Sequence, residues 1–218
     1  QRRLLHDVSH ELRSPLARLQ AAADLMRQQP ERGAEFIERI ERNTARMDKL
    51  IGELLTLARL DAGMTGQLDA DVDLGEIIED IAVDARLEAE TKACAIKIEL
   101  HEPLFTCGSH ELLYRALENV VRNAVRHSPP GSTMTISAKT LAGRLHLSVA
   151  DQGSGVPDAD LAAIFAPFFR SGAGRPDGYG LGLAITRRIT EAHGGSVCAT
   201  NQATGGLLVT LDFPAKRA

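Results

Sequence analysis

The sequence of 218 residues contains no tryptophan, and aromatic residues make up only 4% of it. Aromatic platforms on which nucleic-acid bases stack are therefore not expected. The net charge of −4 also lacks the basic excess of nucleic-acid-binding proteins. We expect no nucleic-acid partner.

Cysteine is scarce as well. Cys94, Cys107 and Cys198 lie far apart, are odd in number and form no C-x-x-C pair. Such a pattern favours a reducing compartment and argues against a structural zinc site or a disulfide framework.

Long apolar runs are missing, since no stretch reaches the roughly 18 residues of a membrane-spanning helix and no signal peptide is visible. The chain begins with Gln1, inside a helical pattern and without an initiator methionine. We interpret it as a fragment of a longer protein, so the missing membrane segments say nothing about the parent. Apolar residues at 44% are enough for a packed core, and charged residues at 25% are ordinary for a soluble protein.

Residues 1–62 are predicted to form a helical hairpin with a break at 28–30. In its second half seven residues repeat with gaps of 4, 3, 4, 3, 4 and 3, namely Phe36, Ile40, Asn43, Met47, Leu50, Leu54 and Leu57. This is a heptad seam. The matching stripe in the first half consists of Leu5, Val8, Leu12, Leu16, Leu19, Ala23 and Met26.

Four further positions, Ile37, Thr44, Ile51 and Ala58, lie beside the seam and widen the apolar stripe. A pair of helices cannot bury so wide a stripe alone. We therefore expect two chains to form a four-helix bundle, which makes the protein a homodimer through residues 1–62. The alternative is a monomeric hairpin packed on the second domain.

The first helix contains the stretch HDVSHELRSP. His6 and His10 are four residues apart and share a helix face, which suits a metal site, a nucleophile or two surface histidines. His10 is two residues from both Val8 and Leu12, so at about 100° per residue it lies opposite the apolar stripe and should face solvent. Pro15 has no N–H, and a bend is expected just before it.

Residues 70–218 are predicted to form a mixed α/β domain after a linker at 63–69. Helices are expected at 74–91, 109–127 and 181–193. Strands are expected at 94–100 and 104–107, in a hairpin over 133–151 that turns at Ala142–Gly143, and in a closing pair formed by SVCATN and LLVTLDF.

Three stretches of this domain point to a ligand. In ENVVRNAVRHS, Asn119 and Asn123 lie one helical turn apart and can offer neutral oxygens to Mg²⁺, with Arg126 within reach of the same ligand. Alone, such a pair of asparagines is equally consistent with capping or a solvated face.

In VADQGSGVP a strand ends at Asp151, and Gly153 and Gly155 would let the backbone approach a flat ligand closely. A buried carboxylate there suits the amino group of adenine, although a simple turn after a strand has the same pattern. In DGYGLGLAITRRI three glycines lead into a helix, so that free N–H groups and the positive helix end face whatever lies there. Between these stretches, FAPFFRSGAGRPDG could close over a bound nucleotide as a lid anchored by Phe165, Phe168 and Phe169.

In this order the stretches resemble the asparagine, first glycine, phenylalanine and second glycine boxes of the ATP-binding domain shared by sensor histidine kinases and by gyrase, mismatch-repair and heat-shock chaperone ATPases. The resemblance covers about residues 70–214 and implies an α/β sandwich of the Bergerat type that binds ATP and Mg²⁺. It implies Asn119 and Asn123 for the metal, Asp151 for the adenine, and Arg126 with Gly178, Gly180 and Gly182 for the phosphates. The remaining nucleotide contacts that it implies are His127, Gly153, Gly155, Phe168, Arg170 and Leu181.

The ATPases of this superfamily carry a glutamate that activates water one turn before the metal-binding asparagine. Here that position is Asn119, which cannot act as a base, and Glu118 lies about 100° away on the helix. The resemblance therefore implies a domain that binds ATP without being built to hydrolyse it.

The stretch HDVSHELRSPLARLQ resembles the phospho-acceptor box of sensor histidine kinases of the osmosensor and envelope-stress type, over about residues 1–62. His10 is then the nucleophile, Glu11 accepts its proton, and Ser14 stands where the family carries the residue used for phosphatase activity. The implied partner is the receiver domain of a response regulator. The implied location is cytoplasmic, with a parent held in the bacterial inner membrane by N-terminal segments absent from this sequence.

Two alternatives stay open, a non-catalytic ATP-binding scaffold and a metallohydrolase that uses His6 and His10.

Overall fold

The computed structural model describes residues 2–101, 103–171 and 178–216. The chain comprises two compact units, of which the first consists mainly of residues 1–56 and the second mainly of residues 57–218. None of the described helices is both long and apolar enough to cross a membrane. The predicted domain boundaries, at 1–62, 63–69 and 70–218, stay predictions.

The first unit is a hairpin of two long helices, α1 (Arg2–Gln28) and α2 (Gly33–Asp61), joined by a 3-10 turn at Pro30–Arg32. Proline is well suited to this turn, because it lacks an N–H and is favoured at the first helical position. The predicted hairpin and its break are thus confirmed. Helix α1 continues through the buried Pro15, and the bend expected there stays a prediction.

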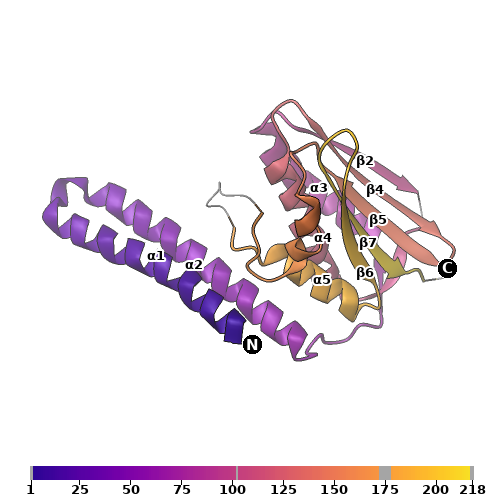
Figure 1. The fold of residues 1–218 in the computed structure, drawn as a ribbon, viewed down its shortest axis with the longest axis horizontal. Helices are drawn as coiled ribbons and strands as arrows, with labels where there is room; N and C mark the ends of the chain where they lie inside the picture. Colours follow the sequence, from indigo (N-terminus) through magenta and orange to yellow (C-terminus); the bar gives the residue numbers. More distant parts are fainter. Residues whose placement is uncertain (1, 102, 172–177, 217–218) are drawn as a thin grey trace. The chain divides into compact units, whose positions relative to one another are not determined.

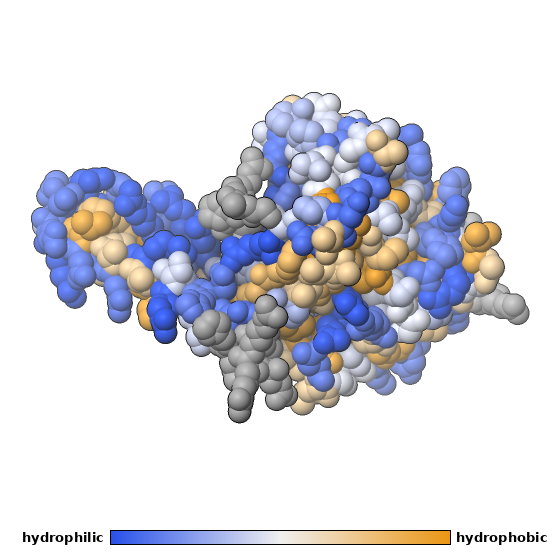
Figure 2. Space-filling view, viewed as in Figure 1, coloured by the Kyte–Doolittle hydropathy of each residue, from blue (hydrophilic) through white to orange (hydrophobic). Residues whose placement is uncertain are grey.

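The heptad seam of α2 faces α1, since Phe36 is 1% exposed and Leu50 is 0% exposed. The neighbouring stripe is not covered, because Ile37 is 49% exposed and Ile51 is 44% exposed. Figure 2 shows apolar surface on the hairpin, flanked by hydrophilic residues. The hairpin therefore buries one of its two apolar stripes and leaves the other open.

Asn43 is the polar member of the buried seam. Its Nδ2 donates to the carbonyl of Arg39 on its own helix (2.8 Å), and its Oδ1 accepts a hydrogen bond from Nε of Arg18 on α1 (3.2 Å). Arg18 also donates to the hydroxyl of Ser14, one turn earlier (2.8 Å). A polar contact thus links the two helices at one alignment.

The second unit contains two sheets. A small antiparallel sheet pairs β1 (Ala70–Asp73) with β3 (Phe105–Gly108). The main sheet has the order β2-β4-β5-β7-β6. Its strands are β2 (Ala95–His101), β4 (Thr133–Leu141), β5 (Arg144–Ala150), β7 (Leu207–Pro214) and β6 (Ser196–Asn201). Among the described strands of this sheet, β2 and β4 are the one parallel pair, and a parallel pair requires a long connection.

Three helices, α3 (Leu74–Glu90), α4 (His110–His127) and α5 (Gly182–Ala192), cover one face of the main sheet (Figure 1). Asp73 and Ser109 cap α3 and α4 with their side chains. Between β5 and α5 lie two 3-10 turns, Asp158–Asp160 and Ala163–Phe165. The predicted α/β domain is confirmed, with each of the expected helices within one or two residues of its predicted bounds.

The core of this unit lies between the helices and the sheet. Alternating residues of the β4–β5 hairpin are buried, among them Met134 and Ile136 on β4 and Leu145 and Leu147 on β5. The hairpin turn at Ala142–Gly143 has a positive φ at both residues (51° and 77°), as a two-residue hairpin turn of type I′ requires.

Helix α3 leaves two of its apolar residues exposed. Val83 is 61% exposed and Leu87 is 66% exposed. The stripe that α3 buries contains Ile78 and Ala85, and at about 100° per residue the two exposed side chains fall on the opposite side of the helix.

Candidate functional site

The predicted phospho-acceptor residues lie on the outer face of α1. His10 and Ser14 are exposed and Glu11 is half-buried, so the expectation that His10 faces solvent is confirmed. Ser14 accepts a hydrogen bond from Arg18. A guanidinium can only donate, and the Ser14 hydroxyl therefore keeps its own proton for a further partner.

His6 belongs to the same helix, but its side chain lies outside the described residues. Among the residues that the structure describes, no group of three His, Cys, Asp or Glu side chains could hold a metal ion.

Asp151 is the buried carboxylate of the second unit, with 3% of its surface exposed. It follows β5 directly, and its Oδ1 accepts hydrogen bonds from the backbone amides of Gly153 (2.8 Å) and Leu207 (3.1 Å). Within the described part of the chain, Oδ2 accepts none. One oxygen is thus fixed by the backbone, and the other is available to a ligand that donates a hydrogen bond.

The loop before β7 holds Asp151 in place, which sequence reasoning missed. Gln202 donates from Nε2 to the Asp151 carbonyl (2.6 Å). A Cβ on Gly206 would lie 2.0 Å from the same carbonyl oxygen, so only glycine fits there. Asn201 exchanges hydrogen bonds with the backbone of Val156 (2.9 and 2.6 Å). The only local signal was the glycine pair before the strand, in a loop longer than a tight turn needs.

The first glycine stretch packs against the end of α4. A Cβ on Gly153 would lie 2.6 Å from the carbonyl oxygen of His127, so the close approach predicted for this glycine is made to α4. Lys92 donates from Nζ to the carbonyls of Val125 and Arg126 (3.1 Å each), which places a positive charge at the negative end of the helix. Arg126 is half-buried and His127 is exposed.

Asn119 joins α4 to the start of α5, because its Nδ2 donates to the carbonyl of Gly182 (3.2 Å). A carbonyl can only accept, so this bond fixes the orientation of the amide and leaves Oδ1 as the oxygen for a ligand. Asn123 is half-buried one turn further along α4. The two predicted metal ligands therefore share a helix face beside the second glycine stretch.

The phenylalanine stretch meets the second glycine stretch at Gly180. The Phe168 amide donates to the Gly180 carbonyl (3.0 Å), and a Cβ on Gly180 would lie 2.5 Å from the Phe169 carbonyl oxygen. Phe168 has a φ of 62°, a conformation that costs a bulky residue free energy and is common at functional sites. The structure brings these two sequence stretches together.

Helix α5 starts after the buried Leu181, which provides no side-chain cap, and its first turn carries no acidic residue. The amides of that turn are left for an anion, and the positive end of the helix favours one. Gly178 has a φ of 106°, and Arg170 is exposed. The predicted lid falls partly on 172–177, which lie outside the described residues. A carboxylate oxygen, two carboxamides, Arg126 and a helix N-terminus together suit a nucleotide with its metal.

Comparison with protein families gives two matches. A family model described as histidine kinase-, DNA gyrase B-, and HSP90-like ATPase matches residues 108–217, and the His Kinase A (phospho-acceptor) domain matches residues 1–63. The two models match different parts of the chain, in the order that the sequence resemblance implied.

Similar curated proteins are sensor kinases. TrcS of Mycobacterium tuberculosis is 36% identical over 91% of this chain and 41% of its own length. CpxA of Escherichia coli K12 is 33% identical over 98% of this chain and 47% of its own length. PfeS of Pseudomonas aeruginosa is 36% identical over 99% of this chain and 47% of its own length. The chain spans about half the length of the curated relatives that it matches.

Solved structures are similar as well. ShkA in complex with AMPPNP matches with a TM-score of 0.75 and 28% identity, over 99% of this chain and 46% of that one. ThkA in complex with the response regulator protein TrrA has a TM-score of 0.79 and 21% identity, over 98% and 61%. AdeS of Acinetobacter baumannii has a TM-score of 0.78 and 20% identity, over 95% and 98%. The last two support the fold alone.

Proposed function

Because this chain belongs to the sensor histidine kinases of two-component systems, we propose that it phosphorylates itself on His10 with ATP and passes the phosphoryl group to an aspartate of a response regulator. The single observation that carries the nucleotide assignment is Asp151, whose buried Oδ1 is held by two backbone amides while Oδ2 stays available. The amino group of adenine is a donor of the kind that this oxygen needs. The AMPPNP complex of the similar ShkA supports the same ligand class.

The phosphates belong, on this proposal, at the start of α5 and beside α4. The uncapped first turn of α5 offers its amides, and Arg126 offers a positive charge. Mg²⁺, when bound through Asn119 Oδ1 and Asn123, offsets negative charge on the phosphates. The resemblance adds His127, Gly155, Arg170 and Gly178 to this nucleotide site as proposed contacts.

The chemical step transfers a phosphoryl group between two nucleophiles. A ring nitrogen of neutral His10 forms a bond to the γ-phosphorus, the bond from that phosphorus to the bridging oxygen breaks, and ADP leaves. Glu11, next in sequence and half-buried, accepts the proton from the other ring nitrogen.

Hydrolysis of ATP is not part of the proposed activity. Asn119 occupies the position of the catalytic glutamate of the related ATPases, and its amide is engaged with Gly182. An amide cannot take a proton from water, so the phosphoryl group needs another acceptor, which His10 provides.

We propose two partners. The uncovered stripe that contains Ile37 and Ile51 supports a homodimer, in which a four-helix bundle buries it. The matches to the phospho-acceptor domain and to sensor kinases such as CpxA support a receiver domain as phosphoryl acceptor. Ser14, exposed one turn after His10, is the proposed residue for phosphatase activity toward that regulator. We also propose that segments preceding this sequence anchor the parent in the inner membrane.

The test is incubation of the chain with γ-labelled ATP and Mg²⁺. We expect protein-bound label that is stable in base and lost in acid, as phosphohistidine is. His10→Gln should lose the label completely, whereas the matched control His6→Gln, one turn earlier on the same helix, should keep it. Label that persists in the His10 variant would place the acceptor elsewhere.

A further inference from the structure

Helices α4 and α5, which carry the proposed nucleotide site, run antiparallel and are held together by three polar contacts. The hydrogen bonds run from Asn119 Nδ2 to the Gly182 carbonyl (3.2 Å), from Thr186 Oγ1 to the Ala116 carbonyl (3.1 Å) and from the Ser109 amide to His193 Nε2 (3.1 Å). Residue numbers rise along one helix as they fall along the other, so all three contacts belong to one axial alignment. The first lies at the nucleotide end and the third at the far end.

His193, at the far end, has its chemical state set by its neighbours. It is 6% exposed, its Nδ1 lies 2.7 Å from the carbonyl oxygen of Ile189, and its Nε2 accepts from the Ser109 amide. The carbonyl can only accept and the amide can only donate. The ring is therefore neutral, with its hydrogen on Nδ1, and burial lowers the pKa of His193.

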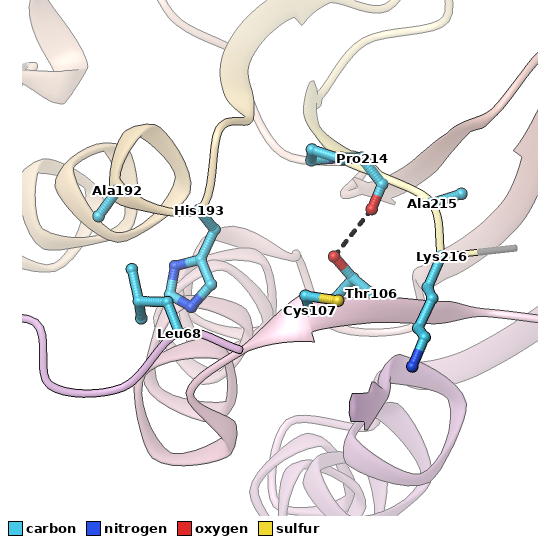
Figure 3. Close-up of a pocket in the computed structure, with 8 residues that line it drawn as sticks. All are labelled: Leu68, Thr106, Cys107, Ala192, His193, Pro214, Ala215 and Lys216. Atoms are coloured by element: carbon cyan, nitrogen blue, oxygen red, sulfur yellow. Dashed lines mark hydrogen bonds between the residues drawn. The ribbon is translucent and has the colours of Figure 1, made fainter. Parts of the chain in front are cut away.

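The side of the ring that faces Gly108 is closely packed. A Cβ on Gly108 would lie 2.3 Å from His193 Cδ2. Figure 3 shows the ring at a cavity of about 220 Å³, with Thr106 and Cys107 on β3 and Lys216 beyond them. The hydroxyl of Thr106 donates to the Pro214 carbonyl (2.9 Å).

The charged groups near the ring form ion pairs with other residues. Lys216 forms an ion pair with Asp71, Cys107 is a free thiol, and Glu191 on α5 pairs with Arg187 and Arg188. The hydrogen-bonding role of the ring is therefore directed at Ser109 and Ile189.

Ser109 is a sensitive point at which to hold α4. It is the N-cap residue, and its hydroxyl accepts from the Leu112 amide (3.4 Å). The rise of 1.5 Å per residue puts Asn119 about 15 Å and Asn123 about 21 Å further along the helix axis. Since a helix is stiff along its axis, a displacement of its first turn is passed to both asparagines.

We propose that His193 is a positioning residue for the nucleotide site: by accepting from the Ser109 amide, it sets the axial alignment of α4 against α5 and hence the distance from Asn119 and Asn123 to the turn at Gly180–Gly182. The inference rests on the proposed function, because its effect is exerted on ATP and its metal. It does not place His193 in contact with either.

Two conservative variants each keep one of the two hydrogen bonds of the His193 ring, to Ser109 or to Ile189. In His193→Gln the amide reaches about as far as Nε2, and its oxygen can accept from Ser109. In His193→Asn the amide reaches only as far as Nδ1, where it can donate to Ile189 but cannot accept from Ser109. We expect the glutamine variant to bind Mg-ATP like the parent chain, and the asparagine variant to bind about tenfold more weakly, because misplacement by about 1 Å has large effects.

A third variant controls for loss of stability alone. Leu145→Ala removes a fully buried side chain from β5 and should lower the melting temperature without weakening Mg-ATP binding. Affinities are measured by calorimetry at a temperature at which circular dichroism shows every variant folded. Equal affinities of the two His193 variants, tight or weak, would overturn the inference, as would equal weakening in Leu145→Ala. Failure of the unsubstituted chain to bind Mg-ATP would instead refute the proposed function.

Discussion

In the helical hairpin the residues proposed to react lie on the outer surface of one helix, whereas in the α/β unit the residue proposed to recognise adenine is buried. His10 and Ser14 are exposed, but Asp151 is 3% exposed and held from both sides. The hairpin thus leaves the proposed nucleophile open to solvent. The α/β unit instead builds a fixed cradle from distant segments.

The two regions also differ in how they are stabilised. The core of the α/β unit comprises the inward faces of a five-stranded sheet and three helices, and it is closed within one chain. The hairpin buries Phe36 and Leu50 but leaves Ile37 and Ile51 open. The incompletely covered surface thus lies on a hairpin that, on our proposal, a second chain completes, whereas the proposed nucleotide site lies in a self-contained unit.

The sharpest way to break this comparison is Asp151→Asn. The two backbone amides require an oxygen at Oδ1, so the asparagine must turn its NH₂ group toward the ligand, where it meets the donor of adenine. We expect the affinity for ATP to fall about a thousandfold, as for other sites with a mismatched polar group, with the fold intact by circular dichroism.

Calorimetry with Mg-ATP checks this expectation. Asp84→Asn, on the exposed face of α3, is the matched control and should bind normally. His10→Gln should also bind normally, since binding and reaction belong to different regions. Unchanged affinity in Asp151→Asn would disprove the adenine assignment.

The second prediction concerns the two stripes of α2. Leu50→Ala opens a cavity in the buried seam and should reduce the free energy of unfolding of the hairpin by about 3 kcal/mol, measured by urea unfolding. Ile51→Ala, one residue further on, should change this free energy little but weaken self-association, measured by analytical ultracentrifugation. If Ile51→Ala left association unchanged, the monomeric hairpin would be the better interpretation.

The smallest expected effect is on pH dependence. Because the pKa of His193 is lowered in the folded state, the unfolded chain binds the proton more tightly, and acid favours unfolding. The contribution of His193 to stability should be complete above its ordinary pKa of 6.5 and be lost as the pH falls below that value, by at most about 1.4 kcal/mol per pH unit.

Thermal unfolding between pH 7.5 and 5.5 checks the sign of this dependence. The loss should appear in the α/β unit, because in the hairpin the buried polar residue among those described is Asn43, which does not titrate. His193→Gln should show a flatter profile. An equally steep profile in that variant would assign the acid sensitivity to other groups.

Local patterns in the sequence predicted most of the elements. The signals that succeeded are short-range ones, namely the heptad seam and the hairpin with its turn at Ala142–Gly143. Each corresponds to an element of the structure. Strand β1 was missed because its four residues include two aspartates and show no apolar run. It forms because β3 lies beside it, and such a partner leaves no trace in a short segment.

For the candidate site, the motifs indicated individual residues but not the contacts that hold them in place. The motifs indicated Asn119 and Asp151, and the burial of Asp151 agrees with the role inferred for it. The contacts that hold Asp151 come from residues 202–207, some fifty positions away, and the contact of Phe168 with Gly180 depends on the path of the intervening chain. Pairings of this kind arise from tertiary packing, which a local pattern does not encode.

Asn43 gives the hairpin a mechanical property. An apolar seam resists sliding weakly, because one methyl group can replace another along it. Asn43 Oδ1 accepts a hydrogen bond from Arg18 of the facing helix in one alignment, and a slip would leave this buried oxygen without that donor, at about 1–3 kcal/mol. A force applied along α1 would therefore be transmitted to α2, because the two helices resist sliding past each other. The hairpin would move as one rigid unit.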